Sequence, residues 1–294
     1  MNRQRIIGIL AMLALGTTAA AADWPSLHEQ ADALTLIEAQ TVFQQTDTFD
    51  SVYIYGLKCL YAHDYPALEQ VIARLQQRDA GRKETRWLEA EMFRRRHEYR
   101  ASEELLDRIL SEDSGFAPAA ISLAYIRYAQ KRYRECLRLV EQVVHLGRER
   151  VDLSNYVRAL ALVGGAKGGL ADQGGPVAKL RYGTQVKSYL SEAQQLQPDS
   201  LAVLIGMGSF YVMAPPLIGG DLDEGIEYLR RAIAEDPRAA VAYARLAQAY
   251  HKKGDQAAFR SYLEKALEID SQDEIALELQ TRAGKPSRRQ GTRE

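Results

Sequence analysis

Histidines are the first residues whose types and spacing could indicate chemistry in this chain, and they complete no catalytic pattern. They are scattered, and no His-Glu-x-x-His pair is present. His63 and His97 lie 34 residues apart. That spacing favours equivalent turns of a repeating structure over two ligands of one metal ion. The sequence therefore predicts no metal site, no cofactor and no enzyme.

The glycine-rich segment 164–179 is a second candidate for chemistry. A phosphate-binding loop needs Lys and then Ser or Thr after its glycines, and neither follows Gly175. A nucleophile elbow of the form Gly-x-Ser-x-Gly is not completed at Ser209, because residue 211 is Tyr. We interpret the segment as a flexible loop.

The predicted helices of this chain recur along the sequence with a fixed period. Tyr65, Tyr99 and Tyr133 follow one another at intervals of 34 residues, and each begins a predicted helical run. A period of 34 is typical of helix-turn-helix repeats. Three further repeats are predicted, and the positions equivalent to these tyrosines are Gly183, Leu222 and Gln256.

The C-terminal part gives the clearest repeat. Tyr243, Leu246, Ala247 and Tyr250 form one helical stripe, and Gly254 ends the helix. This pattern resembles the tetratricopeptide repeat family. The resemblance implies an all-α, right-handed solenoid of about six helix pairs with capping helices at both ends. Proteins of this kind bind partners along an extended surface.

The chain divides into six predicted segments. An apolar run after Arg3 and Arg5, followed by small residues up to Ala22, predicts a cleaved signal peptide and a periplasmic protein. No Cys is placed there for lipid attachment, and no later stretch is long and apolar enough to span a membrane. The segments are 1–22, signal peptide; 23–48, N-terminal capping helix; 49–150, repeats one to three; 151–271, repeats four to six; 272–283, C-terminal capping helix; and 284–294, disordered basic tail.

The capping helix at 23–48 is expected to turn Leu34, Ile37 and Val42 inward. The cysteines, Cys59 and Cys136, fall a whole repeat apart in this frame. Neighbouring helices lie about 8–10 Å apart, while a disulfide needs Cα atoms within about 7 Å. We therefore expect two buried free thiols.

A candidate binding groove follows from the resemblance. The first helix of each tetratricopeptide repeat lines a concave face, and mapping those positions here gives an aromatic and apolar surface. Such a surface suits an extended peptide or an apolar ligand. The alternative is a tight superhelix in which these side chains pack against one another. The candidate groove residues are Tyr53, Leu57, Trp87, Arg94, Tyr125, Tyr128 and Asn155.

Two inserts lengthen the fourth and fifth repeats, at 164–179 and 214–218. Because they occupy the same turn of neighbouring repeats, we expect them to lie side by side and form one lip. The segment from Tyr211 to Leu222 also resembles part of the T component that accompanies some bacterial TRAP transporters. The candidate partner-binding residues of the lip are Tyr211, Met213, Leu217 and Ile218.

These observations favour an exported scaffold or adaptor that binds another envelope protein or a peptide without catalysis. The alternative is a transporter-associated periplasmic component that binds a small apolar ligand or a solute-binding protein. Removal of Arg3 and Arg5 with the signal peptide leaves 36 basic against 39 acidic residues, and this slightly negative charge argues against a nucleic-acid partner. Association with a second copy of the chain stays open.

Overall fold

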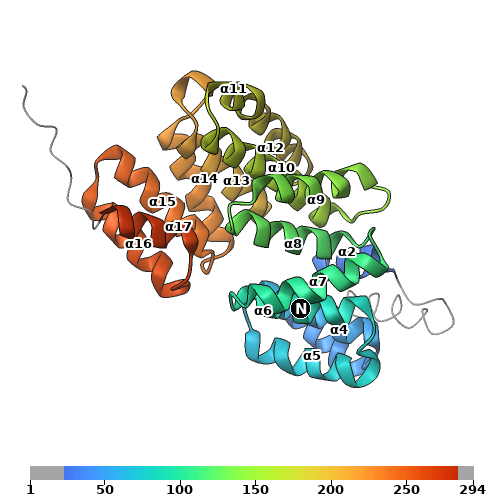
Figure 1. The fold of residues 1–294 in the computed structure, drawn as a ribbon. Coiled ribbons are helices and arrows are strands. Elements are labelled where there is room, and N and C mark those ends of the chain that lie inside the picture. The colour runs from blue at the N-terminus through green and yellow to red at the C-terminus, as the bar shows by residue number, and fades with distance from the viewer. Residues whose placement is uncertain (1–22, 284–294) are drawn as a thin grey trace, which may run out of the picture. The chain divides into compact units, whose positions relative to one another are not determined.

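The computed structural model describes residues 23–283, which form α-helices joined by short turns, with no strand among them (Figure 1). The predicted all-α solenoid of consecutive helix pairs is confirmed. The predicted signal peptide, 1–22, and basic tail, 284–294, lie outside the described residues. The chain divides into two compact units, with the boundary between Ala166 and Lys167. Within residues 23–283, no helix combines the length and apolar character needed to cross a bilayer.

Unit 1 is built from helix pairs, and the periodic tyrosines Tyr65, Tyr99 and Tyr133 begin the second helix of each pair. The pairs α4/α5, α6/α7 and α8/α9 pack together, and α3 packs on α4. The bounds are α2 Trp24–Asp32, α3 Leu36–Thr46, α4 Phe49–Tyr61, α5 Tyr65–Asp79, α6 Lys83–Arg95, α7 Tyr99–Glu112, α8 Ala117–Ala129, α9 Tyr133–Leu146 and the first part of α10, Leu153–Gln173.

The turns inside these pairs explain the spaced histidines. His63, His97 and Lys131 have φ values of 56°, 59° and 58°, so each occupies the left-handed region at the same repeat position. Nδ1 of His63 lies 3.2 Å from the hydroxyl of Tyr65, and Nδ1 of His97 lies 3.0 Å from that of Tyr99. The interpretation of the two histidines as repeated turn residues is confirmed.

The N-terminal segment differs from the single capping helix predicted over 23–48. It forms α2 and α3, with Ala33, Leu34 and Thr35 between them. Thr35 begins α3 with a capping box, in which its hydroxyl accepts from the Glu38 amide while the Glu38 carboxylate accepts from the Thr35 amide. Ile37, predicted inward, is 63% exposed, because the break rotates it away from the core.

Unit 2 continues the paired helices, with α13 against α14 and α15 against α16. Helix α17 covers the apolar cluster of the last pair with Ala276 and Leu279. The bounds are the end of α10, α11 Pro176–Ala178, the π-helix η2 Lys179–Gly183, α12 Thr184–Leu196, α13 Leu201–Met213, the 3-10 helix η3 Pro216–Ile218, α14 Leu222–Glu235, α15 Ala240–Lys253, α16 Gln256–Ile269 and α17 Glu274–Ala283.

The glycine-rich segment is not the flexible loop that we predicted over 164–179. Helix α10 runs through it to Gln173, so most of the extra residues lengthen a helix. Glycine disfavours helix by about 1 kcal/mol per residue relative to alanine. Here packing outweighs propensity, since Ala166 and Leu170 are buried and a Cβ on Gly165 would lie 3.2 Å from Tyr128. Only Gly174 and Gly175 form a turn.

Candidate functional site

Four candidate groove residues of unit 1 do not line an open surface. Tyr53, Leu57, Trp87 and Asn155 are all buried. This corrects the expectation of a solvent-filled aromatic groove at these positions. Helix α2 covers three of them, Tyr53, Trp87 and Asn155.

Helix α2 places its apolar stripe on the first helices of the repeats. The ring of Trp24 meets Phe116 edge-on at 5.5 Å, and the ring of His28 lies 5.4 Å from Trp87. Leu27 and Ala31 continue the stripe and are buried. These residues at i, i+3, i+4 and i+7 face one side of the helix, as amphipathic packing requires.

A buried chain of hydrogen bonds fixes the position of α2. Nε2 of His28 lies 3.0 Å from the hydroxyl of Tyr53, and Nδ1 lies 3.1 Å from Nδ2 of Asn155. Nδ2 of Asn155 also donates to Asp152 at 2.7 Å, and Asp152 accepts from the Asn155 amide at the start of α10. Because Nδ2 is a donor, Nδ1 of His28 accepts and Nε2 carries the proton toward Tyr53.

The protonation state of His28 follows from this burial. Desolvation, with a smaller contribution from the charge of Arg158, lowers the pKa of His28 to about 3. The imidazole is therefore neutral at physiological pH. Two further contacts hold the C-terminal end of α2. Lys58 Nζ donates to the Ala31 carbonyl at 3.1 Å, and Ser154 donates to Asp32 at 2.5 Å.

The remaining groove candidates of unit 1 are half-buried and already engaged. Arg94 donates two hydrogen bonds to Glu91, at 2.7 and 2.8 Å, and lies over the ring of Tyr125. Burial alone would raise the pKa of Glu91, but Arg94 and Arg95 lower it to about 2. Tyr128 packs edge-on against Tyr133 at 5.2 Å. Arg94 is thus tied into an internal ion pair.

Unit 2 carries a different surface, which we call the apolar lip. Leu217 is 96% exposed, Val177 79% and Leu180 73%, and Met213 and Ile218 are partly exposed. A Cβ on Gly183 would lie 3.8 Å from Cδ1 of Ile218, so the segment 176–183 meets the segment 213–218. The apolar lip consists of Val177, Leu180, Met213, Leu217 and Ile218.

The turn that presents Leu217 is tightly closed. Gly220 donates to the Pro215 carbonyl and the Asp221 amide donates to the Tyr211 carbonyl, each at 3.0 Å. A Cβ on Gly220 would lie 1.8 Å from the Ala214 carbonyl oxygen, so only glycine fits there. Backbone hydrogen bonds therefore hold Leu217 outward.

Tyr211, the other residue that we predicted at the lip, packs against neighbouring helices of unit 2. Its ring stacks on Tyr228 at 5.7 Å, and Nζ of Lys187 lies 5.6 Å from its ring centroid. Sequence reasoning missed Val177 and Leu180. The signal that could have found them is the alternation of apolar and basic residues after Pro176.

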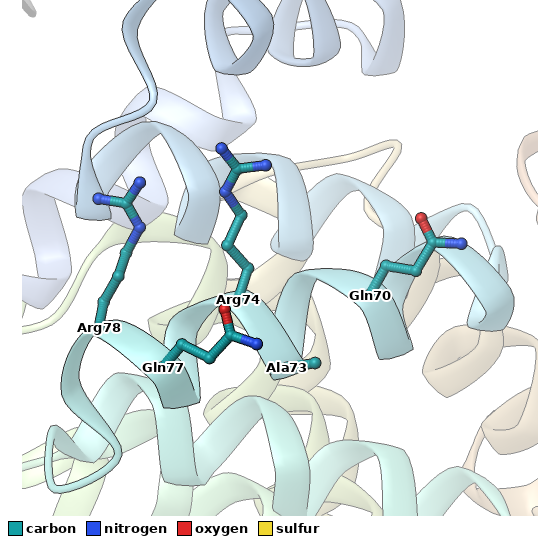
Figure 2. A pocket seen from close by; sticks show the side chains of 5 residues that line it. All are labelled: Gln70, Ala73, Arg74, Gln77 and Arg78. Carbon is teal, nitrogen blue, oxygen red and sulfur yellow. The ribbon is translucent and has the colours of Figure 1, made fainter.

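A shallow hollow on α5 does not amount to a binding site (Figure 2). It is lined by Gln70, Ala73, Arg74, Gln77 and Arg78. Both guanidinium groups contact the carboxylate of Asp47 at 2.6 Å, so they are already engaged within the protein.

Chemistry beyond binding has little support in the described residues. No group of His, Cys, Asp and Glu residues there could hold a metal ion. The prediction of two buried free thiols is confirmed. Burial raises the pKa of Cys59 to about 11 and that of Cys136 to about 12, so neither is an activated nucleophile.

Comparison with known proteins agrees with this description of the fold. The tetratricopeptide repeat family model matches residues 217–283. TTC0263, a tetratricopeptide repeat protein of Thermus thermophilus, superposes with a TM-score of 0.54 at 20% identity, over 68% of this chain and 96% of that one. A tetratricopeptide repeat protein of Parabacteroides merdae superposes with a TM-score of 0.52 at 9% identity, over 95% of this chain and 98% of that one. No curated protein sequence matches.

Residues 217–283 match the tetratricopeptide repeat family, and the described residues share the all-α fold of the superposed tetratricopeptide repeat proteins.

Proposed function

We propose that this protein is an exported, non-catalytic adaptor that binds another protein or a peptide in the bacterial periplasm through the apolar lip. One observation carries the proposal. Two segments of unit 2, 176–183 and 213–218, approach each other at Gly183 and Ile218, and both carry exposed large apolar side chains. Exposed apolar clusters on soluble domains are typical of interaction sites.

The chemistry of the lip indicates the kind of partner. Burying a large aliphatic side chain contributes about 1.5–3 kcal/mol, so Leu217, Val177 and Leu180 together could drive a stable contact. Lys179 and Arg181 alternate with these residues along the chain. We therefore favour a partner with an apolar patch beside acidic side chains.

The proposal of export depends on the sequence of residues 1–22 alone. The basic start, the apolar run and the small residues before Asp23 support it. Fractionation of cells that express the full-length chain, with the mature N-terminus read by mass spectrometry, would test it. An uncleaved protein in the cytoplasm would contradict it.

The first prediction concerns the lip. Leu217→Asp should weaken partner capture at least tenfold, because it places a charge at the centre of the apolar contact. The protein should stay folded, since the side chain is 96% exposed. The measurement is affinity capture from a periplasmic extract, followed by titration of the recovered partner.

The matched control is Leu277→Asp, at an exposed leucine of α17 outside the lip. Capture that falls equally in both variants, or in neither, would count against the lip as the binding surface.

A second candidate function is the transporter-associated component. It is favoured by the rigid turn from Tyr211 to Leu222, which carries the resemblance to the TRAP T component. Its ligand would be a small apolar molecule or a solute-binding protein. Native mass spectrometry that finds no retained ligand, together with no binding to a solute-binding protein, would oppose it.

A further inference from the structure

Helix α2 occupies the groove of unit 1 as a bound ligand would. It is nine residues long. Isolated helices shorter than about 12–15 residues are marginal in water, so its helicity depends on the groove. Both ring nitrogens of His28 have partners on the repeats, Tyr53 on α4 and Asn155 on α10. The groove therefore recognises a particular helix by hydrogen bonds as well as by apolar contact.

The connection between α2 and α3 contains no residue that prevents a helix. Ala33, Leu34 and Thr35 include neither glycine nor proline. Ala33 already has helical dihedral angles, and its amide donates to the Glu29 carbonyl as in a continuing helix. The break is stabilised by the capping box of Thr35 and Glu38 and by the seat of α2 in the groove.

A straight alternative is thus accessible to this segment. If Leu34 and Thr35 became helical, α2 and α3 would form one helix from Trp24 to Thr46. That helix would carry Trp24, Leu27 and His28 out of the groove and leave Tyr53 and Trp87 uncovered. The stripe of α2 and the groove that it leaves are both apolar, and the two surfaces are complementary in shape and hydrogen bonding.

We propose that α2 exchanges between two copies of this chain: the turn at Ala33–Thr35 straightens, and the groove of each unit 1 receives α2 of the other copy. The groove selects this occupant because a second copy supplies the same Trp-x-x-Leu-His stripe and the same hydrogen bonds to Tyr53 and Asn155. Exchange of identical elements between two chains closes a symmetric dimer without any new interface chemistry. The inference does not depend on the function proposed for the apolar lip.

The second prediction tests this exchange with two variants of the turn. Thr35→Ala removes the N-cap and should favour the straight helix. Loss of a cap in both copies should lower the dimer dissociation constant about thirtyfold. Leu36→Pro should have the opposite effect, because proline is accepted at the first position of α3 but cannot continue a helix from α2. Thr35 already has the extended conformation required before proline.

The measurement is light scattering coupled to size exclusion over a range of concentrations of the mature chain. We expect dimer in Thr35→Ala, and none in the double variant Thr35→Ala/Leu36→Pro. The control Thr35→Ala/Leu36→Ala should stay dimeric, which separates the effect of proline from the loss of the leucine side chain. Leu27→Asp in the Thr35→Ala background should abolish the dimer while circular dichroism shows that the repeats remain folded.

Two results would overturn the proposal. A Thr35→Ala protein that stays monomeric at every concentration would show that a second copy does not take the place of α2, even if hydrogen exchange shows that α2 leaves the groove. A dimer that persists in the Leu36→Pro or Leu27→Asp double variants would come from another surface.

Discussion

His28 shows how one buried side chain couples the N-terminal helix to the repeats. It joins Tyr53 and Asn155, which belong to helices far apart in the sequence. Its neutral form fits this site, because one nitrogen must accept a hydrogen bond from the Asn155 amide. Protonation would place two donors against each other. Of the nearby charged groups, Arg158 opposes the charged imidazole and Asp32 favours it.

The third prediction is a pH dependence that originates at His28. In the unfolded chain the imidazole gains a proton below about pH 6.5, whereas in the folded protein its pKa is about 3. The free energy of unfolding should therefore fall as the pH decreases from 6.5 toward 3, by up to about 1.4 kcal/mol per pH unit from this group. Urea denaturation at successive pH values measures the slope.

The variant His28→Gln provides the comparison. Its amide can still form hydrogen bonds but does not titrate, so its slope in this window should be smaller by the same amount. The carboxylates titrate in both proteins and cancel in the difference. Parallel slopes for the two proteins would contradict the assignment to His28.

At the scale of helices and turns, the sequence predicted the turns between helices better than the lengths of the helices. The 34-residue period placed the turn residues His63 and His97 correctly, because turn geometry is local. The course of α10 through its glycines was not predictable from propensity. It depends on close contact with Tyr128, which belongs to another helix. The break between α2 and α3 was missed although the sequence holds a local signal for it, the capping box of Thr35 and Glu38.

The fourth prediction compares two helical glycines. In α10, a Cβ on Gly168 would meet Val186 at an ordinary 4.0 Å, so Gly168→Ala should raise the free energy of unfolding by about 1 kcal/mol through helix propensity. In α13, a Cβ on Gly208 would lie 2.6 Å from Leu229, so Gly208→Ala should destabilise by about 1–3 kcal/mol.

Chemical denaturation of the two single variants measures both effects. Changes of opposite sign in the free energy of unfolding would support a distinction between the two glycines. Gly168 only weakens its helix, whereas Gly208 lets α13 approach α14. Destabilisation by both substitutions would show that α10 also needs a bare backbone at residue 168.

At the scale of the whole molecule, the sequence predicted the architecture better than the binding surfaces. Repeats at a fixed period specify neighbouring helix contacts, so the all-α solenoid followed from spacing and apolar stripes. Whether the candidate groove residues are exposed depends on the packing of α2 against them. Asn155 and His28 are 127 positions apart in the chain, and no periodicity connects them. Leu217 and Ile218 were identifiable because their insert interrupts the period, and the structure exposes them.

The positions of the two cysteines have a practical consequence. Cys59 lies in α4 and Cys136 in α9, both in unit 1, and the sequence places no cysteine in unit 2. Shielded thiols with raised pKa values react slowly with alkylating reagents until the surrounding helices open. The rate at which these native thiols are alkylated therefore measures the opening of unit 1. It does not respond to unfolding that is confined to unit 2.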